Sequence, residues 1–334
     1  MRCAARGAST PSPTSPRWSG RRGPERSPDT GRPRRVCSPH RDRFHRRPPM
    51  SLAFTSLSTF GLEPAAAVLT HGFADYFVQI PFTAGALLQA ARVDSVDLAE
   101  SQIVSADGAA IGAALLARRG WTCRLAGMCL VPEARRRGAG EAFVRHLVAM
   151  AKARGDRSFV LEVIEQNAPA VALYRKCGFR ELRRLLGFAR TTEIGATAER
   201  ASACALTEID PAEMPQHMAN VGTDWPWQIS AATAAQFAPP LRAFRLGDAG
   251  VAVACPDQGD VVIRALGHPA DAAGTRAATA LLRALPAHFS GRRCVIKAVW
   301  PEAAAVVFVE AGFQRTELTQ LQMHRALTAG VSGA

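Results

Sequence analysis

Three kinds of signal are absent from this 334-residue sequence, and each absence excludes a class of protein. No uncharged apolar run reaches the roughly 18 residues of a membrane span, since the longest candidate, Ala109–Ala117, stops at Arg118. The eight cysteines contain no CxxC pair, and no histidine follows them at zinc-ligand spacing. We therefore expect no membrane association and no metal site, and we expect reduced, mostly buried cysteines in a cytoplasmic protein.

Acidic residues are scarce only at the start of the chain. Residues 1–50 hold 13 arginines, no lysine and three acidic residues, which gives them +10 of the total charge of +13. Residues 51–334 keep 28 basic against 25 acidic residues. Because the basicity belongs mostly to this tail, it does not indicate a globular domain that binds a specific nucleic acid.

The tail is also poor in large apolar residues, so residues 1–50 are expected to be disordered. Its arginines and serines would suit a transit peptide, but its prolines oppose the amphipathic helix of such peptides. A twin-arginine signal would need an apolar stretch after Arg22, and none is there. Two interpretations are left, namely a basic arm that binds phosphate and a native start at Met50.

Alternating strands and helices after residue 51 indicate a mixed α/β sheet. The predicted elements are a strand at Leu52–Phe60, a helix from Glu63, a helix at Thr83–Arg92, a hairpin turning at Asp107 and Gly108, a strand at Trp121–Val131, a helix ending near Arg154, a strand at Ser158–Ile164, a helix at Ala168–Lys176 and a strand from Phe179.

A glycine loop with three arginines lies between a strand and a helix. Pro132 ends the strand, and the loop Arg135-Arg136-Arg137-Gly138-Ala139-Gly140 leads into the helix. Glycine lets the backbone approach closely, and a helix N-terminus presents unpaired N–H groups, so the loop suits a pyrophosphate. It is not a Walker A loop, which ends in Gly-Lys-Ser/Thr. Phe143 stands where a dinucleotide fingerprint has its third glycine.

Two blocks together carry a resemblance to a known family. The first block is Val131-Pro132-x-x-Arg135-x-x-Gly138-x-Gly140. The second joins Leu161-Glu162-Val163-x-x-x-Asn167 to Ala172-Leu173-Tyr174-x-x-x-Gly178-Phe179. They resemble the GCN5-related N-acetyltransferase (GNAT) superfamily, and the resemblance covers residues 51–190.

The resemblance implies acetyl-CoA as the acyl donor. The strand that ends at Leu130 and Val131 would pair with the pantetheine arm through its backbone, and Asn167 would hydrogen-bond the same arm. The pyrophosphate would be held by the loop residues Arg135, Arg136, Arg137, Gly138, Ala139 and Gly140.

Two residues are candidates for acid–base catalysis. In this superfamily the tyrosine that matches Tyr174 commonly protonates the departing thiolate, and a phenol keeps its proton at neutral pH. Glu162 matches the glutamate position of the ribosomal-protein N-terminal acetyltransferases, which this block resembles, and is the candidate base. The structural alternatives are a half-buried aromatic ring for Tyr174 and a solvated or salt-bridged strand residue for Glu162.

The second half of the sequence echoes the first at an offset of 134 residues. Val307–Phe313 repeats the pattern of Leu173–Phe179. At this offset Tyr174 corresponds to Phe308, Glu162 to Ile296 and Asn167 to Pro301, and the glycine loop becomes Pro269–Arg276 with Asp271. Phenylalanine cannot donate a proton, so we expect a degenerate copy without normal cofactor binding.

The predicted fold class is therefore α/β, with two GNAT-like domains, each a mixed, mostly antiparallel sheet flanked by helices. The expected divisions are a tail at 1–50, a catalytic domain at 51–195 and a degenerate domain at 200–334, with a linker near 191–203. The second domain is expected to wall the acceptor site. Trp225 and Trp227 would line that wall or pack in a core.

The expected function is direct transfer of an acetyl group from acetyl-CoA to an amine. The acceptor would be a small molecule or a peptide N-terminus, contacted by the apolar segment 76–82. The rival interpretations are a larger acyl donor, an acyltransferase of thiol-cofactor biosynthesis that resembles mycothiol synthase, and a non-catalytic acyl-CoA sensor. Neither the acceptor nor the oligomeric state follows from the sequence.

Overall fold

The computed structural model describes residues 51–80, 82–191, 206–218 and 225–327. All of them lie in one compact unit, Pro49–Ala334. The predictions made for the tail 1–50 and for most of the linker 191–203 fall outside the described residues. In the described ranges, no helix has both the length and the apolar character needed to cross a membrane.

The first half of the chain alternates strands and helices, as predicted. Its elements are β1 Leu52–Ser56, α1 Leu57–Phe60, α2 Leu62–Gly72, α3 Ala84–Asp94, β2 Val96–Ala106, β3 Ala109–Arg119, β4 Thr122–Leu130, η1 Pro132–Ala134, α4 Ala139–Ala153, β5 Ser158–Ile164, α5 Ala168–Lys176 and β6 Arg180–Arg190.

The second half repeats much of this order. Its described elements are β7 Thr207–Ile209, η2 Pro211–Glu213, α7 Met214–Met218, η3 Trp227–Ile229, α8 Ala231–Ala234, β8 Arg242–Leu246, β9 Ala249–Ala254, β10 Val261–Gly267, α9 Ala272–His288, β11 Cys294–Pro301, η4 Glu302–Ala304, α10 Val306–Glu310 and β12 Gln314–Ala326.

The single strand predicted over Leu52–Phe60 is wrong in its second half. The strand β1 ends at Ser56, whose hydroxyl oxygen accepts a hydrogen bond from the Thr59 N–H at 3.2 Å and caps the short helix α1. Serine is a favoured N-cap because its side chain satisfies one of the unpaired N–H groups of the first turn. The alternation of apolar and small residues therefore continued past the real end of the strand.

The strands form one mixed sheet, in the order β1-β2-β3-β4-β5-β12-β6-β11-β10-β9-β8-β7. Among the described strands, β4 pairs with β5 and β10 pairs with β11 in parallel, and every other pairing is antiparallel. The predicted α/β class with mostly antiparallel pairing is confirmed. The two parallel pairs hold corresponding places in the two halves, which fits two GNAT-like domains.

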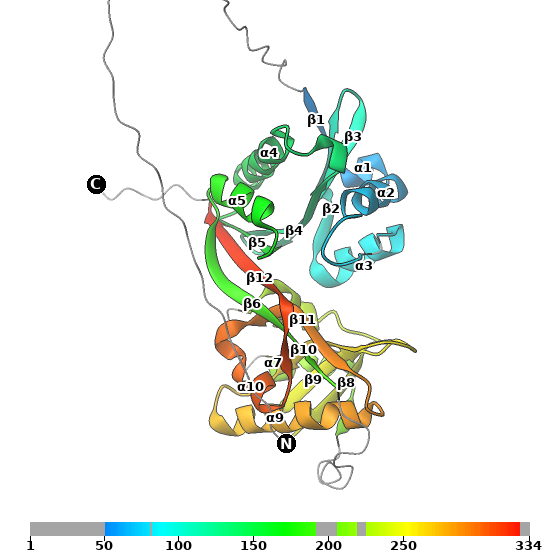
Figure 1. The fold of residues 1–334 in the computed structure, drawn as a ribbon, viewed down its shortest axis with the longest axis vertical. Helices are drawn as coiled ribbons and strands as arrows, with labels where there is room; N and C mark the ends of the chain where they lie inside the picture. Colours follow the sequence, from blue (N-terminus) through cyan, green and yellow to red (C-terminus); the bar gives the residue numbers. More distant parts are fainter. Residues whose placement is uncertain (1–50, 81, 192–205, 219–224, 328–334) are drawn as a thin grey trace, which may run out of the picture. The chain divides into compact units, whose positions relative to one another are not determined.

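The two halves exchange strands, so the sheets of the two GNAT-like domains are joined into one continuous sheet. The last strand, β12, lies between β5 and β6 of the first half, and β6 lies between β12 and β11. Both β6 and β12 run as long strands from the region of β5 to the region of β11 (Figure 1). No sequence signal indicated this exchange, because pairing between distant segments leaves no local pattern.

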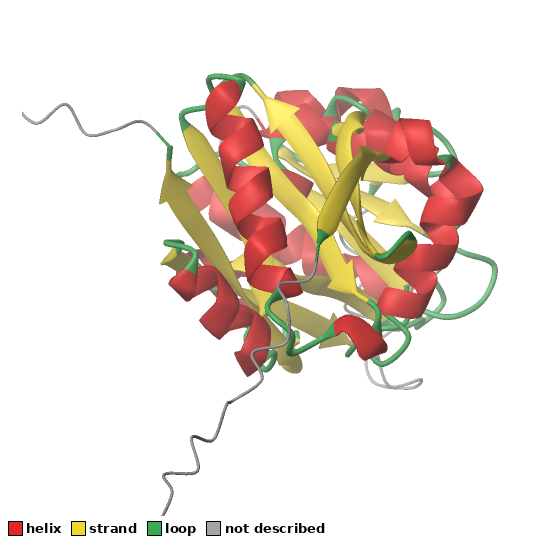
Figure 2. Cartoon of the chain, turned by 90° about the horizontal axis from the view of Figure 1, so that it is seen from above, coloured by secondary structure: helices red, strands yellow, loops and turns green. Residues whose placement is uncertain are grey.

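Helices cover both faces of the sheet (Figure 2). In the first half, α4 and α5 pack with β4 and β5 around a core that contains Phe143, Leu147 and Leu161. On the opposite face, α1, α2 and α3 pack on β2 and β3 around Leu69 and Ile103. The same strands therefore present two different faces, and each face carries a different part of the candidate site.

Candidate active site

The parallel strands β4 and β5 separate part of the way along their length. Their pairing runs from Thr122 and Ser158 to Leu125 and Leu161, and no further pair follows in the described strands. At the same level β4 carries a bulge, because Leu125 and Gly127 lie opposite successive residues of β3 and Ala126 is the extra residue. A bulge bends a strand and increases its twist. The result is a gap that opens between the two strands beyond Leu125.

Past Leu125, the edge of β4 at this gap has no paired strand among the described residues. The Val131 N–H donates to the carbonyl oxygen of Ile111 at 2.9 Å, so it faces the sheet and is not free to pair with a pantetheine arm. Because facing alternates along a strand, the backbone groups of Met128 and Leu130 face the gap. The Leu130 carbonyl accepts a bond from Arg135 Nε at 3.0 Å. Met128, which the sequence did not single out, thus replaces Val131 as a backbone partner facing the gap.

The predicted anion loop leads directly into the N-terminus of α4. Gly138 has φ +85° and Arg136 has φ +62°, and Gly138 has no side chain to cap the helix. In the described part of the chain, the N–H groups of residues 136–140 have no backbone acceptor. The side chains of Arg136 and Arg137 are exposed. A helix start with free N–H groups, a positive dipole end and two cationic neighbours is suited to bind a phosphate.

Arg135 does not belong to this anion site, which corrects the sequence prediction. Its guanidinium donates to both carboxylate oxygens of Asp75, at 2.5 and 2.9 Å, and to the Gly72 carbonyl at 2.9 Å. The hydrogen bond between them raises the pKa of Arg135 and lowers the pKa of Asp75. Arg135 instead ties the end of α2 to the end of β4.

Asn167 lies at the N-terminus of α5, which begins on the predicted residue. Its side-chain oxygen accepts a hydrogen bond from the Ala170 N–H at 3.3 Å and caps the helix. An amide side chain has donors as well as an acceptor. The cap therefore uses only the oxygen, and the side-chain NH2 group takes no part in it.

Tyr174 lies on the α5 side of the sheet, in the apolar core. The residue is 8 % exposed, and its ring packs edge-on against Phe179 with ring centroids 5.9 Å apart. Burial raises the pKa of its hydroxyl well above the ordinary value, so the phenol stays protonated at neutral pH. The chain has only one other tyrosine, Tyr76, and burial raises its pKa as well.

Glu162 lies on the opposite face of the sheet from Tyr174. It is the first residue of β5 beyond the last pair with β4, and its side chain is 3 % exposed. Arg124 Nε donates to Glu162 Oε2 at 2.8 Å, and the Gln228 amide donates to the same oxygen at 3.2 Å. The Gln322 amide donates to Oε1 at 3.2 Å. Glu162 is thus a salt-bridged strand residue in this structure, as the structural alternative in the sequence analysis describes.

A row of polar side chains crosses four neighbouring strands at this point. It consists of Arg124 on β4, Glu162 on β5, Gln322 on β12 and Arg183 on β6, whose Nε donates to Gln322 Oε1 at 2.7 Å. Sequence reasoning missed Arg124, Arg183, Gln228 and Gln322. An arginine at 124, inside an apolar strand, was a usable signal because arginine is almost never fully buried unless it is paired.

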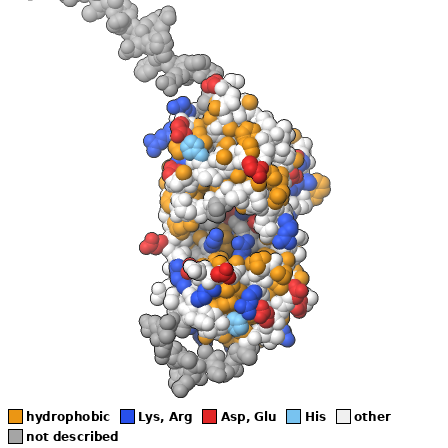
Figure 3. Space-filling model, turned by 90° about the vertical axis from the view of Figure 1, so that its right-hand side faces the viewer, with side chains coloured by type: hydrophobic (Ala, Val, Ile, Leu, Met, Phe, Trp, Pro, Cys, Tyr) orange, Lys and Arg blue, Asp and Glu red, His pale blue; other side chains and the backbone are white. Residues whose placement is uncertain are grey.

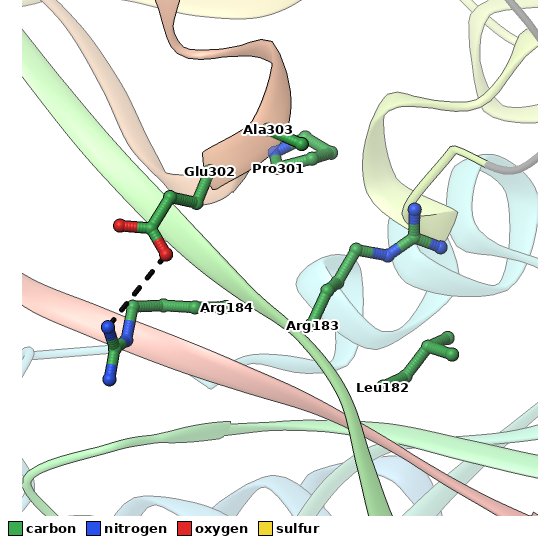
Figure 4. Close-up of a pocket in the computed structure, with 6 residues that line it drawn as sticks. All are labelled: Leu182, Arg183, Arg184, Pro301, Glu302 and Ala303. Atoms are coloured by element: carbon green, nitrogen blue, oxygen red, sulfur yellow. Dashed lines mark ion pairs between the residues drawn. The ribbon is translucent and has the colours of Figure 1, made fainter.

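A cavity of about 570 Å³ lies beside this row, where β6 meets the start of η4 (Figure 4). It is lined by Leu182, Arg183, Arg184, Pro301, Glu302 and Ala303. Arg184 reaches Glu302 at 3.8 Å, while Arg183 points the other way, toward the polar row. The space-filling view toward α1–α3 shows the surface hollowed at mid-height, with basic side chains around the hollow (Figure 3).

The corresponding places in the second half lack these groups. Phe308 is fully buried against Phe188 and Phe313, and Ile296 is 1 % exposed. The side chain of Asp271 accepts a hydrogen bond from the Gly274 N–H at 2.7 Å and caps α9. A carboxylate therefore sits where the first half has free N–H groups.

Trp225 and Trp227, which were expected to line the acceptor site or to pack in a core, each pack in a different hydrophobic core. Trp225 packs against Trp300 in the core of the second half, with centroids 4.7 Å apart. Trp227 packs in the α1–α3 core of the first half and donates from its indole nitrogen to the Asp94 carbonyl at 2.7 Å. Of the described cysteines, Cys123, Cys129, Cys177 and Cys294 are buried, and Cys255 is partly exposed; all five are unpaired.

The described site thus combines two separated strands, an uncapped helix start and a buried phenol on α5. The family model described as the acetyltransferase (GNAT) family matches residues 74–179. This part of the chain is thus similar to GNAT acetyltransferases. It is 37% identical over 78 residues to a streptothricin acetyltransferase of Streptomyces lavendulae, a match that spans 23% of this chain and 41% of that protein.

Solved structures extend the likeness to both halves. A GCN5-related N-acetyltransferase from Sphaerobacter thermophilus matches 84% of this chain and 97% of its own, with a TM-score of 0.60 and 13% identity. A tandem GNAT protein from the clavulanic acid biosynthesis pathway matches 84% of this chain and all of its own, with a TM-score of 0.56 and 15% identity. At such identities the likeness concerns the fold alone.

Proposed function

We propose that the protein transfers an acetyl group from acetyl-CoA directly to an amine, and that residues 51–195 carry the reaction. The observation that carries this proposal is the gap between β4 and β5, with Tyr174 on one face of the sheet and Glu162 on the other. A thioester lying in the gap is open to a proton donor from one side and to an attacking amine from the other.

The donor site fits acetyl-CoA in two places. The free N–H groups of residues 136–140, with Arg136 and Arg137 beside them, match the charge of a pyrophosphate. The backbone of Met128 and Leu130 offers an extended edge for the pantetheine amides, and the side-chain NH2 group of Asn167 is the proposed donor to the same arm. Asp271 would repel a pyrophosphate at α9, so the second half, 200–334, is proposed to bind no acetyl-CoA in this way.

The reaction moves two protons. The amine nitrogen attacks the thioester carbon, the carbon–sulfur bond breaks, and the Tyr174 hydroxyl gives its proton to the departing thiolate. Glu162 is the proposed base that takes the proton from the amine. Its three donors leave acceptor capacity on Oε1, which has one partner against two for Oε2.

The acceptor is proposed to occupy the cavity beside the polar row. Arg183 lines that cavity and is linked through Gln322 to Glu162. Two strand spacings separate β6 from β5, which is about 10 Å. An amine that spans this distance is favoured, such as a peptide N-terminus or an amine on a chain. Streptothricin is a further candidate acceptor, because a relative of this chain is named as a streptothricin acetyltransferase.

The test is calorimetric titration of the full chain with acetyl-CoA, followed by thiol release with a panel of amines. The panel comprises streptothricin, primary alkylamines and peptides with a free N-terminus, and products are identified by mass spectrometry. We expect binding of acetyl-CoA and an N-acetyl product from at least one amine. Absence of acetyl-CoA binding overturns the proposal. Binding without release for any amine supports the acyl-CoA sensor instead, and release only with longer acyl-CoA esters supports a different donor.

The location of the acceptor is tested by filling the cavity. Ala303→Trp places a large ring at an exposed position of the lining and should raise the KM for the acceptor about tenfold or more, because the ring excludes part of the substrate. The affinity for acetyl-CoA should stay unchanged. Val309→Trp, at a position 54% exposed on α10, is the matched control and should leave both values unchanged. Equal KM values for the two variants would place the acceptor elsewhere.

A further inference from the structure

Glu162 belongs to the first half, but two of its three hydrogen-bond donors come from the second. Gln322 lies on β12, directly opposite Glu162 in the antiparallel register, and Gln228 lies on η3. Only Arg124 is supplied by the first half. We infer that Gln228 and Gln322 are positioning residues that hold the Glu162 carboxylate oriented and ionised, so that the second half completes the active site of the first. This inference rests on the proposed role of Glu162.

The loop that carries Gln228 is anchored on the first half at several points. Arg119 of β3 donates to the Trp227 carbonyl at 3.2 Å, to Ser230 Oγ at 2.8 Å and to Thr233 Oγ1 at 2.9 Å. Its guanidinium also lies 4.3 Å from the centroid of the Trp227 ring. Gln228 thus follows a residue that is fixed on both its ring and its carbonyl. Such anchoring is what a site needs if a side chain must hold a partner in one geometry.

Burying the Gln228 side chain costs free energy, and this cost indicates that the side chain has a function. Its amide donates to Glu162, but its buried carbonyl oxygen has no hydrogen-bond partner among the described residues. Unsatisfied buried acceptors are rare in native proteins because the lost hydration is not replaced. A leucine or methionine would avoid that cost while filling similar space. The polar side chain is explained by what its NH2 group does for Glu162.

Gln322 is held just as firmly from its other side. Its Oε1 accepts from Arg183 Nε at 2.7 Å, so its amide is oriented with the NH2 group toward Glu162. Among the described residues, the charged groups tied to this network are Arg124 on β4, which bonds the carboxylate, and Arg183 on β6 behind Gln322, while Arg119 on β3 anchors the loop that carries Gln228. Burial lowers the pKa of Arg119 to about 10, against the charge of Asp94, which raises it, and together with the charge of Arg124, which lowers it. These arginines are left unchanged in the variants below.

The test follows the ionisation of Glu162 itself, so it needs no substrate. Protein labelled with 13C at the glutamate carboxyl carbon is titrated by NMR, and the Glu162 signal is the one missing from Glu162→Gln. Gln228→Met and Gln322→Met keep the shape and remove the donors. Each should move the titration midpoint of Glu162 up by about one pH unit, since hydrogen bonds to the charged form favour it.

A restoring variant and a control complete the experiment. Gln228→Lys supplies a charged donor at the same place and should return the midpoint to the wild-type value or below it. Gln236→Met, at an exposed glutamine of the same half, should have no effect. Midpoints that stay at the wild-type value in both Met variants overturn the inference. A failure of the protein to bind acetyl-CoA would instead overturn the proposed function, and the NMR titration would still decide whether the two glutamines act on Glu162.

Discussion

Replacing Tyr174 with phenylalanine is expected to slow thiol release from acetyl-CoA by about 100-fold or more, the usual contribution of a positioned general acid. The substitution removes one oxygen atom from a ring that is 8 % exposed and packed against Phe179. The burial that raises the pKa of this phenol also keeps it protonated throughout the neutral range, so it is a donor at the pH of the assay. The quantity to measure is kcat, under saturating acetyl-CoA and the best amine of the panel.

The packing of Tyr174→Phe can be checked independently. The affinity for acetyl-CoA and the melting temperature should both stay near the wild-type values, because the ring and its contacts are kept. Thr207→Val, which removes an exposed hydroxyl from the edge strand β7, is the control for the loss of a hydroxyl elsewhere. A Tyr174→Phe enzyme with unchanged kcat would show that the thiolate takes its proton from another group.

Replacing Gly138 with alanine is expected to weaken acetyl-CoA binding by about tenfold or more. Gly138 has φ +85°, where a residue with a Cβ atom is strained by roughly 1–2 kcal/mol. Nothing lies within 4 Å of the added Cβ, so the strain is in the backbone and not in a clash. Relief of that strain turns the N–H groups of the loop away from a common anion, and the pyrophosphate loses several donors together.

The chain offers a matched glycine for comparison. Gly108 in the β2–β3 turn has φ +81° and an equally open Cβ position, but it lies outside the candidate site. Gly108→Ala should lose a similar amount of stability in urea unfolding and bind acetyl-CoA normally by calorimetry. Equal losses of affinity in both variants would mean that Gly138 acts through stability, and that the phosphate site at α4 is wrongly assigned.

Features set by neighbouring residues were predictable from the sequence. The helix at Ala168–Lys176 and the strand at Ser158–Ile164 begin and end where predicted, because an N-cap at Asn167 and a compact apolar run mark them locally. The glycine loop was likewise readable, since Gly138 is required by a positive φ next to a helix start. The charge of Arg135 was misleading, because its partner Asp75 lies far away in the sequence.

The surroundings of Glu162 were not predictable for the same reason. Its donors come from η3 and β12, and no spacing in a single sequence states that β12 lies next to β5. The bulge at Ala126 also has no local marker, although it reorients the strand at the gap. The sequence could thus indicate candidate residues for the chemistry, whereas the contacts around these residues depend on how distant strands pair.

The position of β12 has a consequence for how the chain folds during synthesis. During synthesis the strand β5, which carries Glu162, leaves the ribosome long before its neighbour in the sheet, β12. The edge of β5 in the first half therefore stays unpaired until β12 is synthesised. An unpaired sheet edge is prone to associate with other chains. A stop codon anywhere before β12 removes that neighbour along with Gln322. The sheet of the first half is thus completed only after β12 has been synthesised.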